Sequence, residues 1–371
     1  MTETFAPEIN GVAMTLGRLV DGLIDRGFRV RVFRPRQAPD EAPRVNGHYT
    51  EHLLAGMPIP MYRDMHFGFP AGRSLRRCWR ECRPHAVYVA TEGPLGWSAV
   101  NTARQLHIPS LSGFHTNFHT YSRHYRLSLF EPLILAYLRA LHRRTACTLV
   151  PTATLAAQLR ERAFGCVEVL PRGVDTRLFG PGRRSAELRR QWGLEPEQLA
   201  CLYVGRIAAE KNILAAVRAL HAIQRVRPDA RLVLVGDGPL RKKLAAESPD
   251  FIFCGLRRGV DLASHYASGD LLLFPSQTET FGNVVTEAMA SGLAVVAYNQ
   301  AAAAEHIRDG VNGALARDSS EHSFVHRAVQ LAQTRTRIAD IGRNATAHAQ
   351  SLGWDGIVER FIQLLNERIG G

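Results

Sequence analysis

The chain has 371 residues, of which 46% are hydrophobic and 22% are charged, a composition typical of a globular protein large enough for two domains. No apolar run reaches the roughly 18 residues that a membrane-spanning helix needs, and no signal peptide is visible, so the sequence predicts a cytoplasmic protein. The net charge of +12 favours a polyanionic partner such as a phosphate-rich ligand or anionic lipid headgroups.

Other partner and cofactor classes lack their motifs. There is no Cys/His finger spacing and no RNA-binding aromatic signature, so we expect no nucleic-acid partner. The six cysteines form no Cys-x2-Cys pair and mostly lie in apolar runs, which favours reduced, structural thiols.

The first predicted element is an amphipathic helix with apolar residues at helical spacing from Leu16 to Ile24. Gly27 ends it, and residues 29–34 alternate as in a strand. This order lacks the first strand of a nucleotide-binding βαβ unit. We therefore expect the true N-terminus to lie upstream of Met1, because loss of a central parallel strand would leave backbone groups unpaired in the core.

Two loops of the N-terminal half carry candidate ligand contacts. Before the first helix, Asn10-Gly11 forms either a plain turn or a loop whose glycine lets backbone approach a ligand closely. Residues 85–90 and 109–113 read as strands, and the second opens into a polar loop with His115, His119 and Tyr121. Loops at the carboxyl ends of parallel strands form the ligand crevice of such sheets, although a lone histidine is more often structural.

Two segments, residues 73–80 and 125–144, combine arginines with apolar side chains. Either segment could lie on an anionic bilayer. For the second segment, a core helix with solvated arginines at its ends is an equally good interpretation.

A turn at residues 171–175 follows the strand predicted at 167–170 and marks the domain boundary. We predict an N-terminal domain over residues 1–172, a second domain over 173–352 and a C-terminal amphipathic helix over 353–371.

The second domain opens with a strand at 201–204, and Gly205, Arg206 and Lys211 follow it. The two cations lie at a strand end and a helix start, where they could converge on a diphosphate or simply face solvent. No two aspartates occur at positions i and i+2, so we expect no Asp-x-Asp metal site. Neutralisation of a diphosphate would then fall to Arg206, Lys211 and a helix dipole.

The next strands, 232–235 and 251–255, are followed by Gly236-Asp237-Gly238 and by Leu256. The Gly-x-Gly lacks the third glycine of a dinucleotide fingerprint, and no Gly-x4-Gly-Lys-Ser/Thr occurs, which argues against a dehydrogenase and a P-loop enzyme.

The stretch around which the second half is organised begins with a strand at 271–274 and a loop from Pro275, and continues as a helix from about Phe281 to Gly292. Unpaired backbone N–H groups at such a helix start attract phosphate. Glu279 lies just before the helix and Glu287 inside it. Two carboxylates flanking a phosphate site suit a nucleotide sugar, whereas the simpler interpretation is an acidic helix start.

The spacing from Glu279 to Glu287 resembles the Glu-x7-Glu motif of retaining glycosyltransferases of family 4. The resemblance extends over nearly the whole chain and includes residues 205–211 and the Phe-His-Thr at 114–116. It implies the α/β GT-B fold, in which two Rossmann-like domains face each other across a cleft and a C-terminal helix crosses back to the first domain.

The resemblance also implies site residues. The catalytic set would be His115, Glu279, Arg206 and Lys211. Donor binding would fall to Asn10, Gly11, Gly205, Arg206, Lys211, Leu256, Glu279, Thr280, Phe281, Gly282, Asn283 and Glu287. Acceptor binding would fall to Glu8, Asn10, His119 and Tyr121, and no metal or cofactor is implied. Where many relatives have Gly-Gly-x-x-Glu, this chain has four alanines and Glu305, which narrows that loop.

Residues 92–96 and 114–125 look most like bacterial GDP-mannose-dependent α-mannosyltransferases. The implied function is metal-independent, retaining transfer of a hexose from a nucleotide sugar (GDP-mannose or a UDP-hexose) to a lipid acceptor. The enzyme would be peripheral on the inner face of the membrane. The alternatives are a UDP-sugar diacylglycerol glycosyltransferase, a basic binding module that has lost turnover, and an epimerase or phosphorylase on the same fold.

Overall fold

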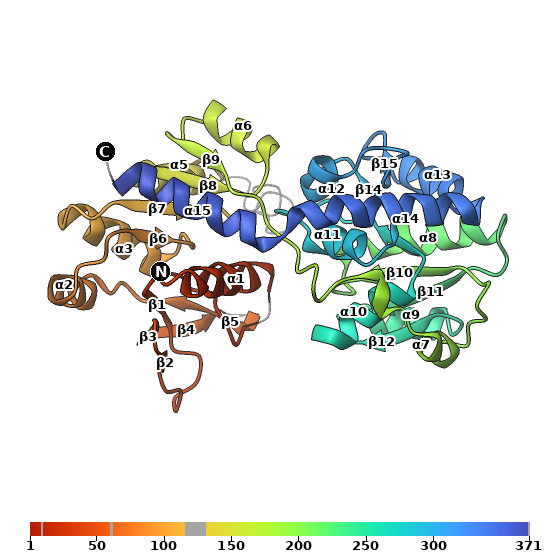
Figure 1. The fold of residues 1–371 in the computed structure, drawn as a ribbon, viewed down its shortest axis with the longest axis horizontal. Coiled ribbons are helices and arrows are strands. Elements are labelled where there is room, and N and C mark those ends of the chain that lie inside the picture. Colours follow the sequence, from red (N-terminus) through yellow and green to blue (C-terminus); the bar gives the residue numbers. More distant parts are fainter. Residues whose placement is uncertain (9, 60–61, 116–130, 370–371) are drawn as a thin grey trace. The chain divides into compact units, whose positions relative to one another are not determined.

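A computed structural model describes residues 1–8, 10–59, 62–115 and 131–369 and shows an α/β fold with parallel sheets (Figure 1). The chain divides into two compact units. Unit 1 comprises Met1–Arg172 together with Trp354–Gly371, and unit 2 comprises Gly173–Gly353. No helix within the described ranges is both long and apolar enough to cross a bilayer.

The described elements of unit 1 include a run of five consecutive strands, β1 to β5, and otherwise alternate between strands and helices. In chain order they are α1 (Gly11–Asp25), β1 (Val30–Pro35), β2 (Val45–Asn46), β3 (Tyr49–Leu54), β4 (Gly56–Ile59), β5 (Tyr62–Gly68), α2 (Gly72–Glu81), β6 (Val87–Val89), α3 (Pro94–Gln105), β7 (Ser110–Gly113), α5 (Glu131–His142), β8 (Cys147–Val150), α6 (Ala153–Glu161), β9 (Val167–Val169) and α15 (Trp354–Ile369).

The first residues of the chain connect two sheets of unit 1. One sheet has the order β1-β3-β2, and the other is parallel with the order β6-β7-β8-β9. The backbone N–H of Thr2 donates to the Phe33 carbonyl at 3.0 Å, and the Ala90 N–H donates to the Met1 carbonyl at 2.9 Å. Met1 and Thr2 thus pair with β1 on one side and with the residue after β6 on the other, as a strand between the two sheets would.

Helix α15 packs against α1 inside unit 1. A Cβ on Gly22 of α1 would lie 2.5 Å from a methyl carbon of Val358, so the glycine allows the two helices to approach closely. Val358, Phe361 and Leu364 of α15 are buried with Leu19 of α1. The last helix of the chain therefore belongs to the core of the first unit, in agreement with the predicted fold class.

The elements of unit 2 alternate between helices and strands as far as α13, which α14 follows directly. They are α7 (Ala186–Gln191), β10 (Ala200–Val204), α8 (Ile213–Gln224), β11 (Arg231–Val235), α9 (Arg241–Glu247), β12 (Ile252–Gly255), α10 (Gly259–Ser268), β13 (Leu271–Phe274), α11 (Asn283–Ala290), β14 (Ala294–Tyr298), α12 (Ala301–His306), β15 (Ala314–Ala316), α13 (Glu321–Ala332) and α14 (Arg335–Ala349), with short 3₁₀ turns at Pro181–Arg183, Ala209–Lys211 and Gln350–Leu352.

Unit 2 contains a six-stranded parallel sheet with the order β12-β11-β10-β13-β14-β15. Alternating residues of β10 supply both of its faces, since Cys201 and Tyr203 join one apolar cluster and Leu202 and Val204 the other. A sheet covered on both faces explains why its strands read as nearly continuous apolar runs. The strand order reverses between β10 and β13, and such a switch point is where open α/β sheets bind ligands, beside the carboxyl ends of the strands.

The cysteines follow the expectation only in part. All six are free thiols, and Cys147 and Cys201 are buried. Cys82 and Cys166 are exposed, so a packing role is wrong for these two. Cys82 directly follows α2 and Cys166 directly precedes β9, so both lie at element ends, where the sequence pattern gives no clear face.

Candidate functional site

The candidate site of unit 2 lies at the switch point, between the loops that follow β10 and β13. We call these two loops, residues 205–212 and 275–282, the donor loops. A Cβ on Gly236, which follows β11, would lie 2.0 Å from the Gly205 carbonyl oxygen. Gly236 also has a φ of +143°. Glycine is therefore required for the loop after β11 to pack against the first donor loop.

Lys211 and Glu279 connect the two donor loops. The Lys211 Nζ donates to the Glu279 carboxylate at 2.6 Å, and the two side chains are 28% and 17% exposed. The loops are also joined by Thr278, whose hydroxyl donates to the Glu210 carbonyl at 3.0 Å. The topology thus brings together a cation and a carboxylate that are 68 residues apart in the chain.

Arg206 lies on the same loop but is oriented differently. Its guanidinium donates to Glu210 four residues later at 3.1 Å, and its side chain is half exposed. The Tyr203 hydroxyl donates to the Arg206 carbonyl at 2.8 Å and fixes the backbone at this position. Arg206 therefore borders the site, whereas Lys211 lies directly against Glu279.

The start of α11 supplies backbone donors next to this pair. Gly282 is the N-cap residue, with a φ of +88°, and no side chain caps the helix. Phe281 is buried, with its ring 5.8 Å from that of His306, and its carbonyl accepts from the Ala302 N–H at 2.7 Å. Asn283, the first helical residue, has a buried side-chain oxygen without a hydrogen-bond partner among the described residues. The start of α11 has no side-chain cap, and such a helix start favours an anion.

Glu287 is buried deeper in the same helix, 8% exposed. It accepts a hydrogen bond from the Tyr266 hydroxyl at 2.9 Å. Burial raises the pKa of Glu287 to about 7, although the Tyr266 bond opposes the shift. Among the described residues Glu287 forms no ion pair, so its carboxyl oxygens are able to accept from ligand hydroxyl groups.

The remaining donor residues of the prediction lie around these loops. Leu256, which follows β12, is 60% exposed and offers an apolar surface at the carboxyl edge of the sheet. Thr280 is partly buried and Glu305 is exposed. Ala301 adopts a φ of +51°, a region that favours glycine.

In unit 1, Asn10 and Gly11 begin helix α1. The Asn10 side-chain oxygen accepts from the backbone N–H groups of Val12 and Ala13 at 3.1 and 2.8 Å, and its amide donates to the Thr4 hydroxyl at 2.6 Å. Asn10 is thus the N-cap of α1, and Gly11 is its first residue. Asn10-Gly11, which we interpreted as a turn or as a loop near a ligand, is a capped helix start in the structure.

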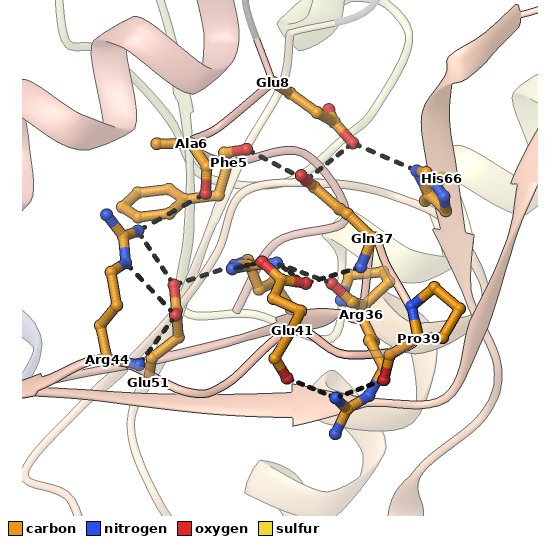
Figure 2. A network of polar contacts seen from close by, with 12 residues as sticks. Phe5, Ala6, Glu8, Arg36, Gln37, Pro39, Glu41, Arg44, Glu51 and His66 are labelled. Atoms are coloured by element: carbon orange, nitrogen blue, oxygen red, sulfur yellow. Dashed lines mark hydrogen bonds and ion pairs between the residues drawn. The ribbon is translucent and has the colours of Figure 1, made fainter.

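Glu8 points into a polar network of unit 1 (Figure 2). It accepts from the Gln37 side-chain amide at 3.1 Å, and His66 lies 3.8 Å away. Burial raises the pKa of Glu8. The same network holds Arg34 between Glu41 and Glu51, with bonds to Glu51 at 2.9 Å, so its main part supports β1 and β3.

His115 lies at the end of β7 among buried groups. Its Nε2 is 3.3 Å from the Tyr88 hydroxyl, and its Nδ1 is 3.4 Å from Nη2 of Arg172. Burial, followed by the charges of Arg172 and His142, lowers the pKa of His115 to about 3. The imidazole is therefore neutral near pH 7, with Nδ1 placed to accept from the guanidinium.

Arg172 is a residue whose place in the site the sequence did not indicate. It is 6% exposed and lies 57 positions from His115 in the chain, in the turn that we interpreted only as a domain boundary. His119 and Tyr121 lie outside the described residues. No group of three His, Cys, Asp or Glu residues suited to a metal ion occurs in the described part of the chain.

Comparison with known proteins decides the family. Residues 9–178 match the family described as Glycosyltransferase Family 4, and residues 198–334 match the one described as Glycosyl transferases group 1. A GDP-mannose-dependent alpha-mannosyltransferase of Corynebacterium glutamicum is 32% identical over 320 residues, which cover 85% of this chain and 75% of that protein. The chain belongs to glycosyltransferase family 4. It is thus a glycosyltransferase, as the Glu279 to Glu287 motif predicted.

This family 4 glycosyltransferase is also similar to proteins that are not named as mannosyltransferases. A sulfoquinovosyl transferase of Arabidopsis thaliana is 30% identical over 307 residues, covering 80% of this chain and 59% of that protein. The structure of sucrose-phosphate synthase from Thermosynechococcus elongatus superposes with a TM-score of 0.80 at 20% identity, covering 99% of this chain and 94% of that one. This structural likeness confirms the GT-B fold.

Proposed function

We propose that the enzyme transfers a hexose, preferably mannose from GDP-mannose, to a lipid acceptor at a membrane surface, with retention of configuration and without a bound metal. The observation that carries the proposal is the Lys211–Glu279 pair beside the uncapped start of α11. At this switch point, the Lys211 cation suits the diphosphate, the Glu279 carboxylate suits the hydroxyl groups of the sugar, and the backbone N–H groups at the start of α11 suit phosphate oxygens.

In this mechanism, each side chain of unit 2 has a separate task. Lys211, Arg206 and the helix start at Gly282 stabilise the charge that grows on the diphosphate as the sugar leaves. Glu279 accepts from hydroxyl groups of the sugar, and Glu287 accepts from the ribose. Leu256 packs against the base.

Retention then proceeds by attack on the same face of the sugar. Double displacement would need a carboxylate nucleophile on the far face, whereas we assign Glu279 to hydroxyl binding. The departing diphosphate takes the proton of the acceptor hydroxyl, while the bond from the anomeric carbon to the diphosphate oxygen breaks and the bond to the acceptor oxygen forms. His115 contacts the sugar as a neutral ring, consistent with its lowered pKa.

The preference for GDP-mannose comes from the relatives. The Corynebacterium glutamicum protein is named for GDP-mannose, and the Arabidopsis thaliana protein for a sulfoquinovosyl group. The second candidate function, transfer from a UDP-sugar to diacylglycerol, rests on relatives named alpha-monoglucosyldiacylglycerol synthase, at 25% and 24% identity.

An exposed face of α5 supports membrane attachment. Leu133 is 68% exposed and Tyr137 is 38% exposed, although Leu138 and Leu141 of the same helix are buried. Helix α2 differs from the prediction, because its Leu75 and Trp79 pack into the core and leave mainly its arginines outside. The apolar contact with a bilayer is therefore assigned to α5 alone.

Incubation with a panel of nucleotide sugars and membrane lipids tests the reaction. We expect labelled glycolipid from GDP-mannose, and labelled diacylglycerol glycoside from a UDP-sugar if the second candidate is right. Release of sugar phosphate, or sugar conversion without an acceptor, would instead show a phosphorylase or an epimerase. Binding of a nucleotide sugar without turnover on any lipid would support the binding module.

Vesicle sedimentation tests the membrane surface. We expect binding to anionic vesicles that decreases as salt rises, because electrostatic attraction is screened. Leu133→Ser should weaken the binding, whereas Leu214→Ser, at an exposed leucine of unit 2, should not. Equal binding to neutral vesicles, or equal effects of the two variants, would contradict the assignment.

A further inference from the structure

Two of the six cysteines lie side by side in unit 1. Cys147 is the first residue of β8, and Cys166 directly precedes β9, which pairs with β8 in parallel. The Thr148 N–H donates to the Cys166 carbonyl at 2.9 Å, so Cys147 and Cys166 are neighbours across the two strands. Their sulfur atoms are 2.8 Å apart. The sheet thus brings together two thiols that are 19 positions apart in the chain.

The spacing of the strands suits a covalent bond between these two sulfurs. Neighbouring strands lie about 4.8 Å apart, and the Cα atoms of a disulfide are usually about 4.4–6.8 Å apart. Since the two sulfurs already touch, the thiols can join without a rearrangement of the backbone.

The two thiols differ in their access to solvent and in the charge beside them. Cys147 is 1% exposed and packs with Phe361 and Leu364 of α15, whereas Cys166 is exposed. Nη2 of Arg368, also on α15, lies 3.4 Å from the Cys166 sulfur. The Arg368 Nε is buried without a hydrogen-bond partner among the described residues. The guanidinium therefore faces the sulfur that a reagent can reach, and a cation there stabilises negative charge on that sulfur.

Burial gives the two thiols a fixed order of reaction. It is the main cause that raises the pKa of the Cys147 thiol, and the neighbouring Cys166 adds to it. The thiolate is the form that attacks a disulfide, and attack also needs access. Exchange with a molecule from solvent therefore begins at Cys166, and Cys147 acts second.

The thiol pair lies away from the residues assigned to sugar transfer. Strands β7, β8 and β9 run parallel, and His115 follows the carboxyl end of β7. Cys147 and Cys166 lie at the amino ends of β8 and β9, at the opposite edge of the same sheet. Reaction of the pair can thus be tested independently of the proposed function.

We propose that Cys147 and Cys166 form a dithiol site that reacts with small-molecule disulfides and closes to a reversible disulfide between β8 and β9. In the first step, the Cys166 thiolate attacks one sulfur of the small disulfide and breaks its sulfur–sulfur bond. The released thiolate takes up a proton and leaves as a thiol. In the second step, Cys147 loses its proton and attacks the Cys166 sulfur, which releases the second small thiol. The two cysteines are oxidised, and the small disulfide is reduced to two thiols.

Oxidised glutathione is the probe, and peptide mapping of the full chain is the measurement. Cys147 and Cys166 lie in separate tryptic peptides, residues 145–160 and 163–172, each bounded by arginines. After incubation of the reduced protein with the probe, we expect these two peptides to be joined by a disulfide that dithiothreitol cleaves. Glutathione alone on Cys166, or an unreacted Cys166, would overturn the proposal.

Cys82 is the matched comparison within the same chain. It is exposed, and Nη2 of Arg31 lies 2.6 Å from its sulfur, but no hydrogen-bonded thiol neighbour of Cys82 occurs among the described residues. We expect Cys82 to take up glutathione without forming a disulfide to Cys78. A disulfide between Cys78 and Cys82 in place of the one between β8 and β9 would contradict the proposal.

Variants separate the two steps. Cys147→Ser should stop at glutathione on Cys166. Cys166→Ala, at an exposed position where the core is spared, should leave Cys147 unmodified. Glutathione on Cys147 in this variant would overturn the assigned order.

The rate of the first step tests the role of Arg368. In Cys147→Ser, the further change Arg368→Gln should slow the modification of Cys166, because the cation beside its sulfur is removed. Arg360→Gln, at another arginine of α15 that pairs with Glu168 and Glu367, is the control and should leave the rate unchanged. Equal rates in the two variants would contradict the role of Arg368.

Discussion

Replacement of Glu287 by glutamine should change how the stability of the enzyme depends on pH. In the folded chain, burial raises the pKa of this carboxyl from the usual 4.5 to about 7. Between these two values the unfolded chain carries an ionised carboxylate and the folded chain a protonated one, so unfolding releases a proton. The free energy of unfolding therefore falls as the pH rises from 4.5 to 7 and is flat, for this group, above 7.

The size of the effect follows from the two pKa values. One pKa unit corresponds to about 1.4 kcal/mol, so the wild type loses about 3 kcal/mol through Glu287 across this window. Glu287→Gln cannot ionise and should lose none of it. The uncharged amide keeps the size of the side chain and an oxygen that accepts from Tyr266.

Urea unfolding at pH 5, 6, 7 and 8 measures the difference. We expect the variant to gain stability relative to the wild type between pH 5 and 8, by up to about 3 kcal/mol. Glu195→Gln, at an exposed glutamate of unit 2, is the control and should show a constant difference from the wild type. Parallel curves for Glu287→Gln and the wild type would refute the argument from burial.

Four further outcomes follow from the site. Lys211→Ala should lower kcat by about 100-fold, because it removes charge that stabilises the leaving diphosphate. Lys243→Ala, at an exposed lysine of α9, is the control and should leave kcat unchanged. Equal effects of the two variants would contradict the role of Lys211. Activity should persist in EDTA, and full loss restored by Mg²⁺ or Mn²⁺ would show a metal requirement. Glu279→Gln should lower donor affinity and kcat together. After incubation with a fluorinated donor, mass spectrometry should find no sugar attached to the protein. A sugar adduct on Glu279 would show double displacement. Ala301→Gly should raise stability by up to about 1 kcal/mol in thermal unfolding because the left-handed backbone there is strained for alanine, and unchanged stability would contradict that strain.

The sequence predicted the fold class and most element positions because apolar periodicity and glycine positions are local signals. The strand predicted at 29–34 is β1 at Val30–Pro35, and the helix predicted from about Phe281 to Gly292 is α11 at Asn283–Ala290. The motif from Glu279 to Glu287 could also be recognised in the sequence, because both residues lie within one loop and the helix that follows it.

Contacts between residues far apart in the chain could not be predicted from the sequence. The contact of Arg172 with His115 depends on the segments that follow β7 and β9, two strands on either side of β8 that come near each other only in the folded sheet. Pairing of Lys211 with Glu279, rather than Arg206 with Glu279, likewise depends on the parallel register of β10 and β13. The burial of Trp79 in α2 was missed because a helix rich in arginine was interpreted from its charge and not from its apolar face.

The anomeric configuration of the product tests the central claim most directly. Nuclear magnetic resonance of the glycolipid made from GDP-mannose should show an α-linked mannose, as in the donor, and Glu279→Gln should form it far more slowly. A β-linked product, or the same rate in Glu279→Gln, would contradict retaining transfer at the Lys211–Glu279 site.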